Sequence, residues 1–364
     1  MKTIKIGSKS IEIPIIQGGM GIGVSLGNLA GTVMEQGGMG VISLANPGFR
    51  REDFYTNPLA ANLEAVAQEI EKARAIAKDK GMLAVNIMVA LTSYSDYVKT
   101  AVKNKVDAII AGAGLPLDLP QLTKGSDTLI APIVSSGKAA ALICKSWDKK
   151  HEAAPDFIVI EGSEAGGHLG FSKEELKENR TLDLSSILND VKEAIAPFQE
   201  KFKKHIPIFV GGGIFTGKDI ASFLDAGADG VQMGTRFIGT HECDAPSSYK
   251  DMFINANKED ITIIASPVGM PGRAIKNKFI EYVESSRNEV ERCIGCLKSC
   301  NPNSTPYCIT EALINAVTGN DDRGLFFSGT NGYLINKLVS VKELIKELTT
   351  ETKEFLKGQL KSDE

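Results

Sequence analysis

The sequence has no long apolar run and no basic patch, and these absences exclude several classes of protein. No apolar run reaches the roughly 20 residues that a membrane-spanning helix needs. The 364 residues carry a net charge of −4, and no basic patch with interleaved aromatic residues points to nucleic acid. The first ten residues, MKTIKIGSKS, lack the apolar segment of a signal peptide. We therefore expect a cytoplasmic protein with neither a membrane nor a nucleic acid as its partner.

Two glycine motifs for nucleotides are also missing. Because there is no G-x-x-x-x-G-K-[ST] loop, a nucleoside triphosphate is not the expected ligand. The first predicted strand ends in Gln17-Gly18-Gly19-Met20, whereas a doubly wound sheet usually has a G-x-G-x-x-G turn there. The doubly wound sheet therefore becomes the less favoured of two α/β architectures.

Apolar strand-like runs alternate with helical patterns along most of the chain, which predicts parallel strands joined by helices. Eight such units in about 240 residues match the size of a TIM (β/α)8 barrel. We assign residues 1–245 to the barrel and residues 246–364 to a helical C-terminal appendage packed on it. The predicted strands are 13–17, 40–44, 83–87, 107–112, 128–134, 156–161, 206–211 and 230–233.

Helices are predicted both between the strands and in the tail. Apolar residues from Leu63 to Ala77 recur at helical spacing. Another helix is expected over 184–196, ending before Pro197 because proline cannot donate its backbone hydrogen bond. The other predicted helices cover 25–36, 249–256, 310–318 and 339–360.

The most informative stretch is 161–170, which reads EGSEAGGHLG directly after the apolar run 157–160. Glycines at the end of a strand let the backbone approach a ligand closely. A histidine in that place can transfer a proton near neutral pH. His168 is therefore the candidate catalytic acid or base.

Two later loops have the composition of a phosphate site. Residues 211–217 read GGGIFTG and residues 232–236 read QMGTR, so the loops follow the seventh and eighth predicted strands. In TIM barrels these two loops often bind phosphate through backbone N–H groups. Gly213, Gln232, Met233, Gly234 and Thr235 are therefore candidates for binding the phosphate and nearby parts of a cofactor.

At this point the chain resembles the nitronate monooxygenase family, formerly called 2-nitropropane dioxygenases, and its neighbour, the enoyl-ACP reductase II family. The resemblance covers roughly residues 10–280. The matching segments are IIQGGM (15–20), AVNIMV (84–89), AGAG (111–114), EGSEAGGHLG (161–170), VGGGI (210–214), QMGTRF (232–237) and PGRAIKN (271–277).

Both families are FMN-dependent TIM barrels, so the resemblance implies FMN and a set of site residues. Gly18, Gly19, Met20 and Asn86 would contact the flavin ring, and Glu161 and Gly166 would lie along the ribityl chain and the ring edge. Gly213, Gly234 and Thr235 would hold the phosphate. His168 would face the reactive side of the flavin.

Two positions differ in which of the two families they resemble. Glu161 stands where many nitronate monooxygenases have Gln, and this resembles the reductases. The loop after the fifth strand, Val134-Ser135-Ser136, looks more like the monooxygenases, and it makes Ser135 a further candidate flavin contact. The sequence leaves the subfamily open.

Four of the six cysteines lie within residues 293–308, as Cys293, Cys296, Cys300 and Cys308. Their C-x2-C-x3-C-x7-C spacing resembles, over its first three members, the iron–sulfur site of dienoyl reductases related to old yellow enzyme. Thiolates this close in sequence can bind an iron–sulfur cluster or zinc. The alternative is a set of reduced cysteines with no metal.

The leading interpretation is an FMN-dependent oxidoreductase that oxidises alkyl nitronates, a small-molecule substrate, with O2. The first alternative is an enoyl-thioester reductase that uses NAD(P)H. The second is a flavin and iron–sulfur electron-transfer protein. The sequence leaves open whether the protein forms a homodimer.

Overall fold

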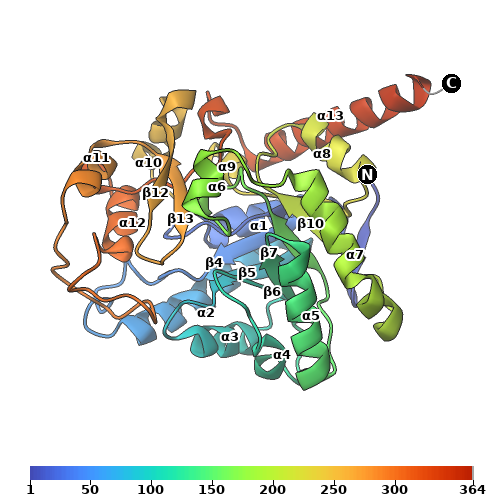
Figure 1. Cartoon of the computed structure of the whole chain (residues 1–364), viewed down its shortest axis with the longest axis horizontal. Coiled ribbons are helices and arrows are strands. Elements are labelled where there is room, and N and C mark those ends of the chain that lie inside the picture. Colours follow the sequence, from blue (N-terminus) through green and yellow to red (C-terminus); the bar gives the residue numbers. More distant parts are fainter. Residues whose placement is uncertain (363–364) are drawn as a thin grey trace.

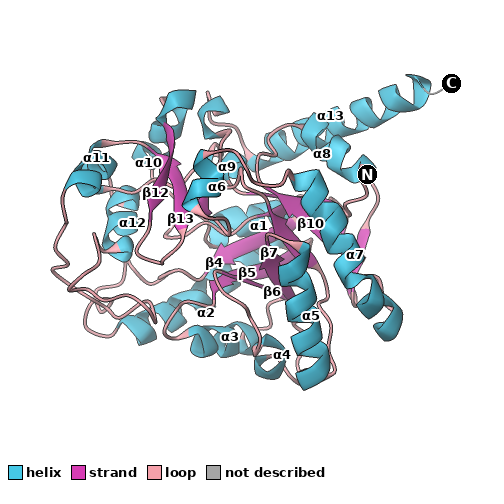
Figure 2. Cartoon of the chain, viewed as in Figure 1, coloured by secondary structure: helices cyan, strands magenta, loops and turns pink. Residues whose placement is uncertain are grey.

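The centre of the molecule is a closed barrel of eight parallel strands (Figures 1 and 2). The computed structural model describes residues 1–362. All eight predicted strands are confirmed, each within two residues of the predicted bounds. They are β3 (Ile15–Gln17), β4 (Met39–Ser43), β5 (Met82–Met88), β6 (Ala108–Gly112), β7 (Leu129–Val134), β8 (Ile158–Glu161), β10 (Ile208–Gly211) and β11 (Gly230–Met233).

The strand register brings the sequence motifs to one end of the barrel. Gly211 pairs with Glu161 on one side and with Gln232 on the other, and Met233 pairs with Gln17. These residues lie at or next to the last position of their strands, so the loops that follow meet around the same opening. This is the end at which TIM barrels place their active sites.

Helices surround the barrel as the alternation predicts. They are α1 (Gly27–Glu35), α2 (Pro58–Ala77), α3 (Tyr94–Lys103), α4 (Leu119–Leu122), α5 (Gly137–His151), α7 (Leu184–Phe202) and α8 (Gly217–Asp225), with the short α6 (Lys173–Lys177) and α9 (Thr235–Ile238) in loops. The predicted end of α7 before Pro197 is wrong, because the helix continues through the proline to Phe202. Phe198 and Ile195 are buried, and we attribute the continuation to this packing, which outweighs one missing hydrogen bond.

A hairpin near the N-terminus closes the opposite end of the barrel. Its strands are β1 (Ile4–Ile6) and β2 (Lys9–Ile11), which pair antiparallel. Ile6 and Ile11 have no exposed surface and pack against side chains of the barrel interior, including Phe157 and Phe209. The hairpin therefore leaves the carboxyl ends of the strands as the open end.

Helices make up most of the regular secondary structure of the C-terminal appendage, as predicted. Its helices are α10 (Ser247–Ile254), α11 (Lys278–Ser285), α12 (Ile309–Val317) and α13 (Val341–Ser362), with short 3-10 turns at Lys258–Asp260, Asp321–Arg323 and Gly332–Leu334. In Figure 1, α10, α11 and α12 lie on one side of the barrel and α13 runs beside α8. Residues 363 and 364 of the predicted appendage lie outside the described residues.

A three-stranded sheet that the sequence reasoning did not foresee joins the appendage to the barrel. Strands β12 (Ile261–Ala265) and β13 (Pro271–Ile275) form a hairpin, and β13 pairs with β9 (Gly167–His168) in the loop after β8. The division of the chain at residue 245 stays a prediction, but this sheet shows that the two parts share the site.

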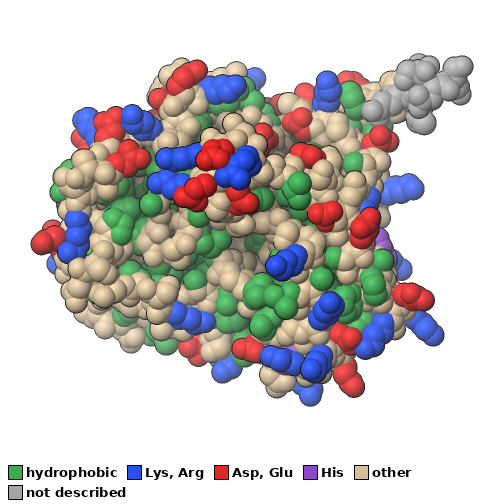
Figure 3. Space-filling view, viewed as in Figure 1, with side chains coloured by type: hydrophobic (Ala, Val, Ile, Leu, Met, Phe, Trp, Pro, Cys, Tyr) green, Lys and Arg blue, Asp and Glu red, His purple; other side chains and the backbone are tan. Residues whose placement is uncertain are grey.

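On the face seen in Figure 3, Lys and Arg lie among Asp and Glu, with hydrophobic side chains between them. Among the described residues, no helix is both long enough and apolar enough to cross a membrane.

Candidate active site

A cavity of about 270 Å³ opens at the carboxyl ends of the barrel strands. Nearly all the residues that the sequence analysis proposed as flavin contacts or as the catalytic acid or base lie on its wall. These are Gly18, Gly19, Met20, Asn86, Glu161, Gly166, His168, Gly213, Gln232, Met233, Gly234 and Thr235. Residues from five different strand ends therefore converge on one site.

Ser135 is the exception. It follows β7 but is not among the residues that line the cavity, whereas Ile133 of the same strand is. Its hydroxyl lies so close to Gly170 that a Cβ there would be 2.5 Å from the oxygen. The loop that carries His168 lies against Ser135 at Gly170. The structure therefore gives no support for Ser135 as a flavin contact.

The glycine-rich loop after β8 is held in place by residues of the appendage. Arg273 of β13 is 8% exposed, and its guanidinium donates hydrogen bonds of 2.6 Å to the carbonyls of Ser163 and Ala165. A Cβ on Gly166 would approach the backbone nitrogen of Gly329 to 2.5 Å, so this position requires glycine. These contacts fix the direction in which the loop presents His168.

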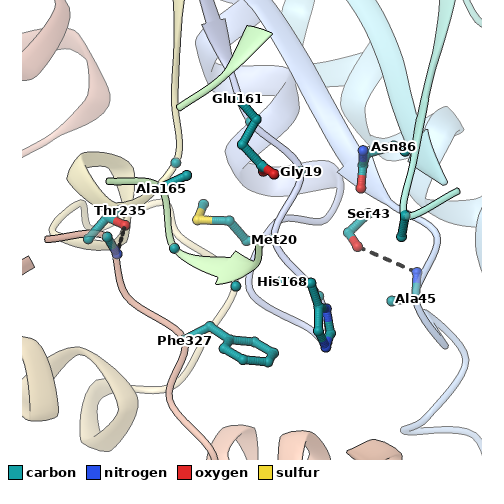
Figure 4. A pocket seen from close by; sticks show the side chains of 18 of the residues that line it. Gly19, Met20, Ser43, Ala45, Asn86, Glu161, Ala165, His168, Thr235 and Phe327 are labelled. Atoms are coloured by element: carbon teal, nitrogen blue, oxygen red, sulfur yellow. Dashed lines mark hydrogen bonds between the residues drawn. The ribbon is translucent and has the colours of Figure 1, made fainter. Parts of the chain in front are cut away.

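His168 lies on the cavity wall next to Phe327 (Figure 4). Its Nε2 is 2.7 Å from the hydroxyl of Ser266, and its ring meets the edge of Phe327 with the ring centroids 4.9 Å apart. Burial lowers the pKa of His168 to about 4, because the charged form loses its hydration. The ring is therefore neutral at pH 7 and can accept a proton.

Glu161 ends β8 and also faces the cavity (Figure 4). Burial raises the pKa of its carboxyl from 4.5 to about 8, because the ionised form is poorly hydrated there. At pH 7 most of the carboxyl groups hold a proton, and each can donate a hydrogen bond. A protonated acid and a neutral base therefore share one cavity, which is common at active sites.

The two loops predicted to bind phosphate meet at the cavity wall. Gly212 and Gly213 have φ angles of 110° and 78°, which side chains disfavour. Glycine here leaves the backbone N–H groups accessible, and Thr235 adds a hydroxyl. The residues present therefore fit a phosphate held by backbone amides. The carboxylate of Glu164 lies against Gly213, so a phosphate there needs this side chain turned aside.

Comparison with known proteins identifies the family. The sequence profile of the nitronate monooxygenase family matches residues 2–351. The chain belongs to the nitronate monooxygenase family. Probable nitronate monooxygenases of Staphylococcus aureus strains MSSA476 and Newman are 26% identical to it over 302 residues, covering 77% of this chain and 80% of each relative.

Solved structures agree with the fold. FabK from Thermotoga maritima has a TM-score of 0.73 and 26% identity, and the match covers 97% of this chain and 96% of FabK. Nitroalkane oxidase from Streptomyces ansochromogenes also has a TM-score of 0.73, with 20% identity over 96% of this chain and 98% of the oxidase; this second likeness supports the fold alone. The family and the fold make this chain a flavin-dependent oxidoreductase built on a TIM barrel.

The sequence analysis missed several residues of the site, among them Ser43 and Asn46 of the barrel. The missed residues that contact His168 and the phosphate loops come from the appendage. The amide of Asn331 donates to the carbonyl of Gly213 over 2.6 Å, and the backbone N–H of Gly329 donates to the hydroxyl of Thr235 over 2.9 Å. Ser266 and Phe327 contact His168, as described above. The run SGTN at 328–331 has the composition of a turn. Its sequence does not indicate that this turn contacts the phosphate loops.

The four clustered cysteines of this family member lie around one small cavity. All four line a second cavity of about 30 Å³, and all are free thiols. Thr310 donates its hydroxyl hydrogen to the Cys296 sulfur over 3.2 Å. Within residues 1–362, no three His, Cys, Asp or Glu side chains form a group that could hold a metal. The expected iron–sulfur cluster or zinc therefore has no support, and neither has the electron-transfer alternative.

Proposed function

We propose that this protein oxidises alkyl nitronates, with O2 as the co-substrate and FMN as the bound flavin. The observation that carries the proposal is a neutral imidazole, His168, on the wall of a cavity whose other loops fit a flavin phosphate. The names of its relatives, probable nitronate monooxygenases, support the same reaction.

The residues that would hold FMN divide into two groups. Backbone amides at 211–213 and 234–235, with the hydroxyl of Thr235, would bind the phosphate. The turn at 18–20 and the amide of Asn86 would lie against the ring. When bound, FMN supplies the electron acceptance and the reaction with O2, and the protein supplies orientation and proton control.

His168 would remove the α-proton when the substrate is a neutral nitroalkane. If its Nε2–H donates to Ser266, the other ring nitrogen keeps a lone pair for that proton. The contacts with Ser266 and Phe327 restrict rotation of the ring. A nitronate that is already formed has lost this proton, so its oxidation depends less on His168.

The test is anaerobic reduction of the purified, FMN-loaded protein. A nitronate should bleach the flavin spectrum, whereas NADH and NADPH should leave it unchanged, and admitting O2 should then restore the oxidised spectrum. Bleaching by NADH or NADPH but not by any nitronate would refute the proposal.

Two observations favour a second candidate, an enoyl-thioester reductase. Glu161 matches the reductase pattern, and FabK, an enoyl-ACP reductase II, is as similar to this chain as the curated monooxygenases are. In that reaction the protonated carboxyl of Glu161 would lie in a cavity where a proton donor is needed. NAD(P)H consumption that depends on crotonyl thioester would establish this candidate in place of the first.

A further inference from the structure

The appendage lines part of the cavity with hydrophobic side chains, although Thr310 of α12 lies among them. Figure 4 places His168 and Phe327 at one side of the cavity, away from Glu161 and Asn86. Hydrophobic residues of the β5–α3 loop, the β12–β13 turn, the segment 293–308 and α12 also line the cavity. We call this set the alkyl wall; it consists of Leu91, Val268, Met270, Leu297, Ile309 and Leu313.

The alkyl wall is held by backbone contacts, so its shape is set before a ligand binds. Leu91 and Leu297 form an isolated antiparallel bridge. The backbone N–H of Thr92 donates to the carbonyl of Cys296, and that of Lys298 donates to the carbonyl of Ala90, both over 3.0 Å. Leu91 is 4% exposed and Leu297 6% exposed. A preformed hydrophobic wall favours ligands with hydrocarbon groups.

The same cavity lacks positive charge. None of the described residues that line it is Lys or Arg, and its acidic side chains are Glu161 and Glu164. Arg273, a buried cation, donates to two carbonyls of the loop after β8 and is not among the residues lining the cavity. Lys298 directs its ammonium group to the carbonyl of Val89. A carboxylate on the substrate would therefore lose water without gaining a counter-ion, which is strongly unfavourable.

We propose that the alkyl wall binds the hydrocarbon substituent of the substrate and selects nitronates whose chain carries no second charge. The proposal rests on the function proposed above. It predicts that an isopropyl group in place of a carboxylate converts a poor substrate into a good one, although the two groups have nearly the same shape.

The test uses two nitronates that differ only in that group. They are the nitronates of 3-nitropropionate and of 3-methyl-1-nitrobutane, assayed by O2 consumption with FMN-loaded protein. We expect kcat/KM to be at least about a hundredfold higher for the branched alkyl nitronate, because the carboxylate is desolvated without a partner. Equal values, or a preference for the carboxylate, would overturn the proposal and leave nitronate oxidation itself established.

A substitution on the wall should reverse the preference. Met270 is half-buried in the β12–β13 turn, and Met270→Lys supplies an ammonium group on a chain of similar length. The ratio of the two kcat/KM values should shift towards the carboxylate by at least about tenfold. Met270→Leu is the matched control and should keep the original ratio. If Met270→Lys loses FMN, Leu313→Lys makes the same test from α12.

A binding measurement separates this proposal from the proposed function. Hexanamide and hexanoate have the same chain, and only hexanoate is charged. Titrating each into the oxidised holoprotein should give changes in the flavin spectrum, with hexanamide binding at least about tenfold more tightly. If no nitronate is oxidised but hexanamide is preferred, the proposed function fails and the alkyl wall stands. If hexanoate binds equally well, the alkyl-wall proposal fails.

Discussion

Replacing Glu161 by Gln should change how the stability of the protein depends on pH. The carboxyl of Glu161 has a pKa raised from 4.5 to about 8 by burial. Between these pH values the folded protein holds a proton that the unfolded chain has released. Stability therefore falls as the pH rises from 4.5 to about 8. Gln cannot ionise, so the variant should not show this loss.

The size of the effect follows from the two pKa values. Each unit of pKa difference corresponds to about 1.4 kcal/mol. Raising the pH from 5 to 8 should thus favour Glu161→Gln over the wild type by about 3 kcal/mol of unfolding free energy. The pKa of His168, lowered to about 4, gives the opposite trend from about pH 4 to 6.5. It is present in both proteins and cancels in their difference.

The assay is urea unfolding of flavin-free protein at pH 5 and pH 8, followed by tryptophan fluorescence. Trp147 is the only tryptophan in the sequence, and it is fully buried. Asn331→Ala is the control, because it alters the same cavity without changing a titratable group. A difference between variant and wild type that is the same at both pH values would refute the burial argument for Glu161.

Four further predictions concern His168, the phosphate loops and the cysteines. His168→Asn should retain FMN and slow turnover of a neutral nitroalkane by about two to four orders of magnitude, with a smaller effect on a preformed nitronate. Wild-type turnover of the nitroalkane should fall as the pH drops through about 4, where His168 becomes protonated, and a pH-independent rate would contradict its role as the base. Gly213→Asp should weaken FMN retention on gel filtration, because it adds a side chain and like charge beside the phosphate; full retention would remove these loops from the site. Metal analysis of anaerobically prepared protein should find far less than one iron or zinc per chain, because the described residues form no metal-binding group, and a stoichiometric metal would restore the cluster interpretation of Cys296 and its neighbours.

Local patterns in the sequence were sufficient for the barrel strands, the phosphate loops and His168, whereas the flavin contacts Gly18–Met20, Asn86, Glu161 and Gly166 came from the family resemblance. Buried parallel strands are short β-branched runs such as 157–160, and glycines after them indicate where a ligand approaches the backbone. The end of α7 was predicted wrongly, because the propensity of Pro197 was opposed by packing that no local pattern records.

The sequence by itself determined the barrel, the glycine-rich loops and the histidine, because each can be identified from residues that are close together in the sequence. Only the tertiary structure decided what surrounds them. Ser266 lies 98 residues from His168 and Asn331 lies 118 residues from Gly213, and no periodicity relates positions so far apart. The same holds for charge. The composition of the chain is nearly balanced in charge and does not predict that the alkyl wall lacks a cation. This depends on which side chains the fold places at the cavity.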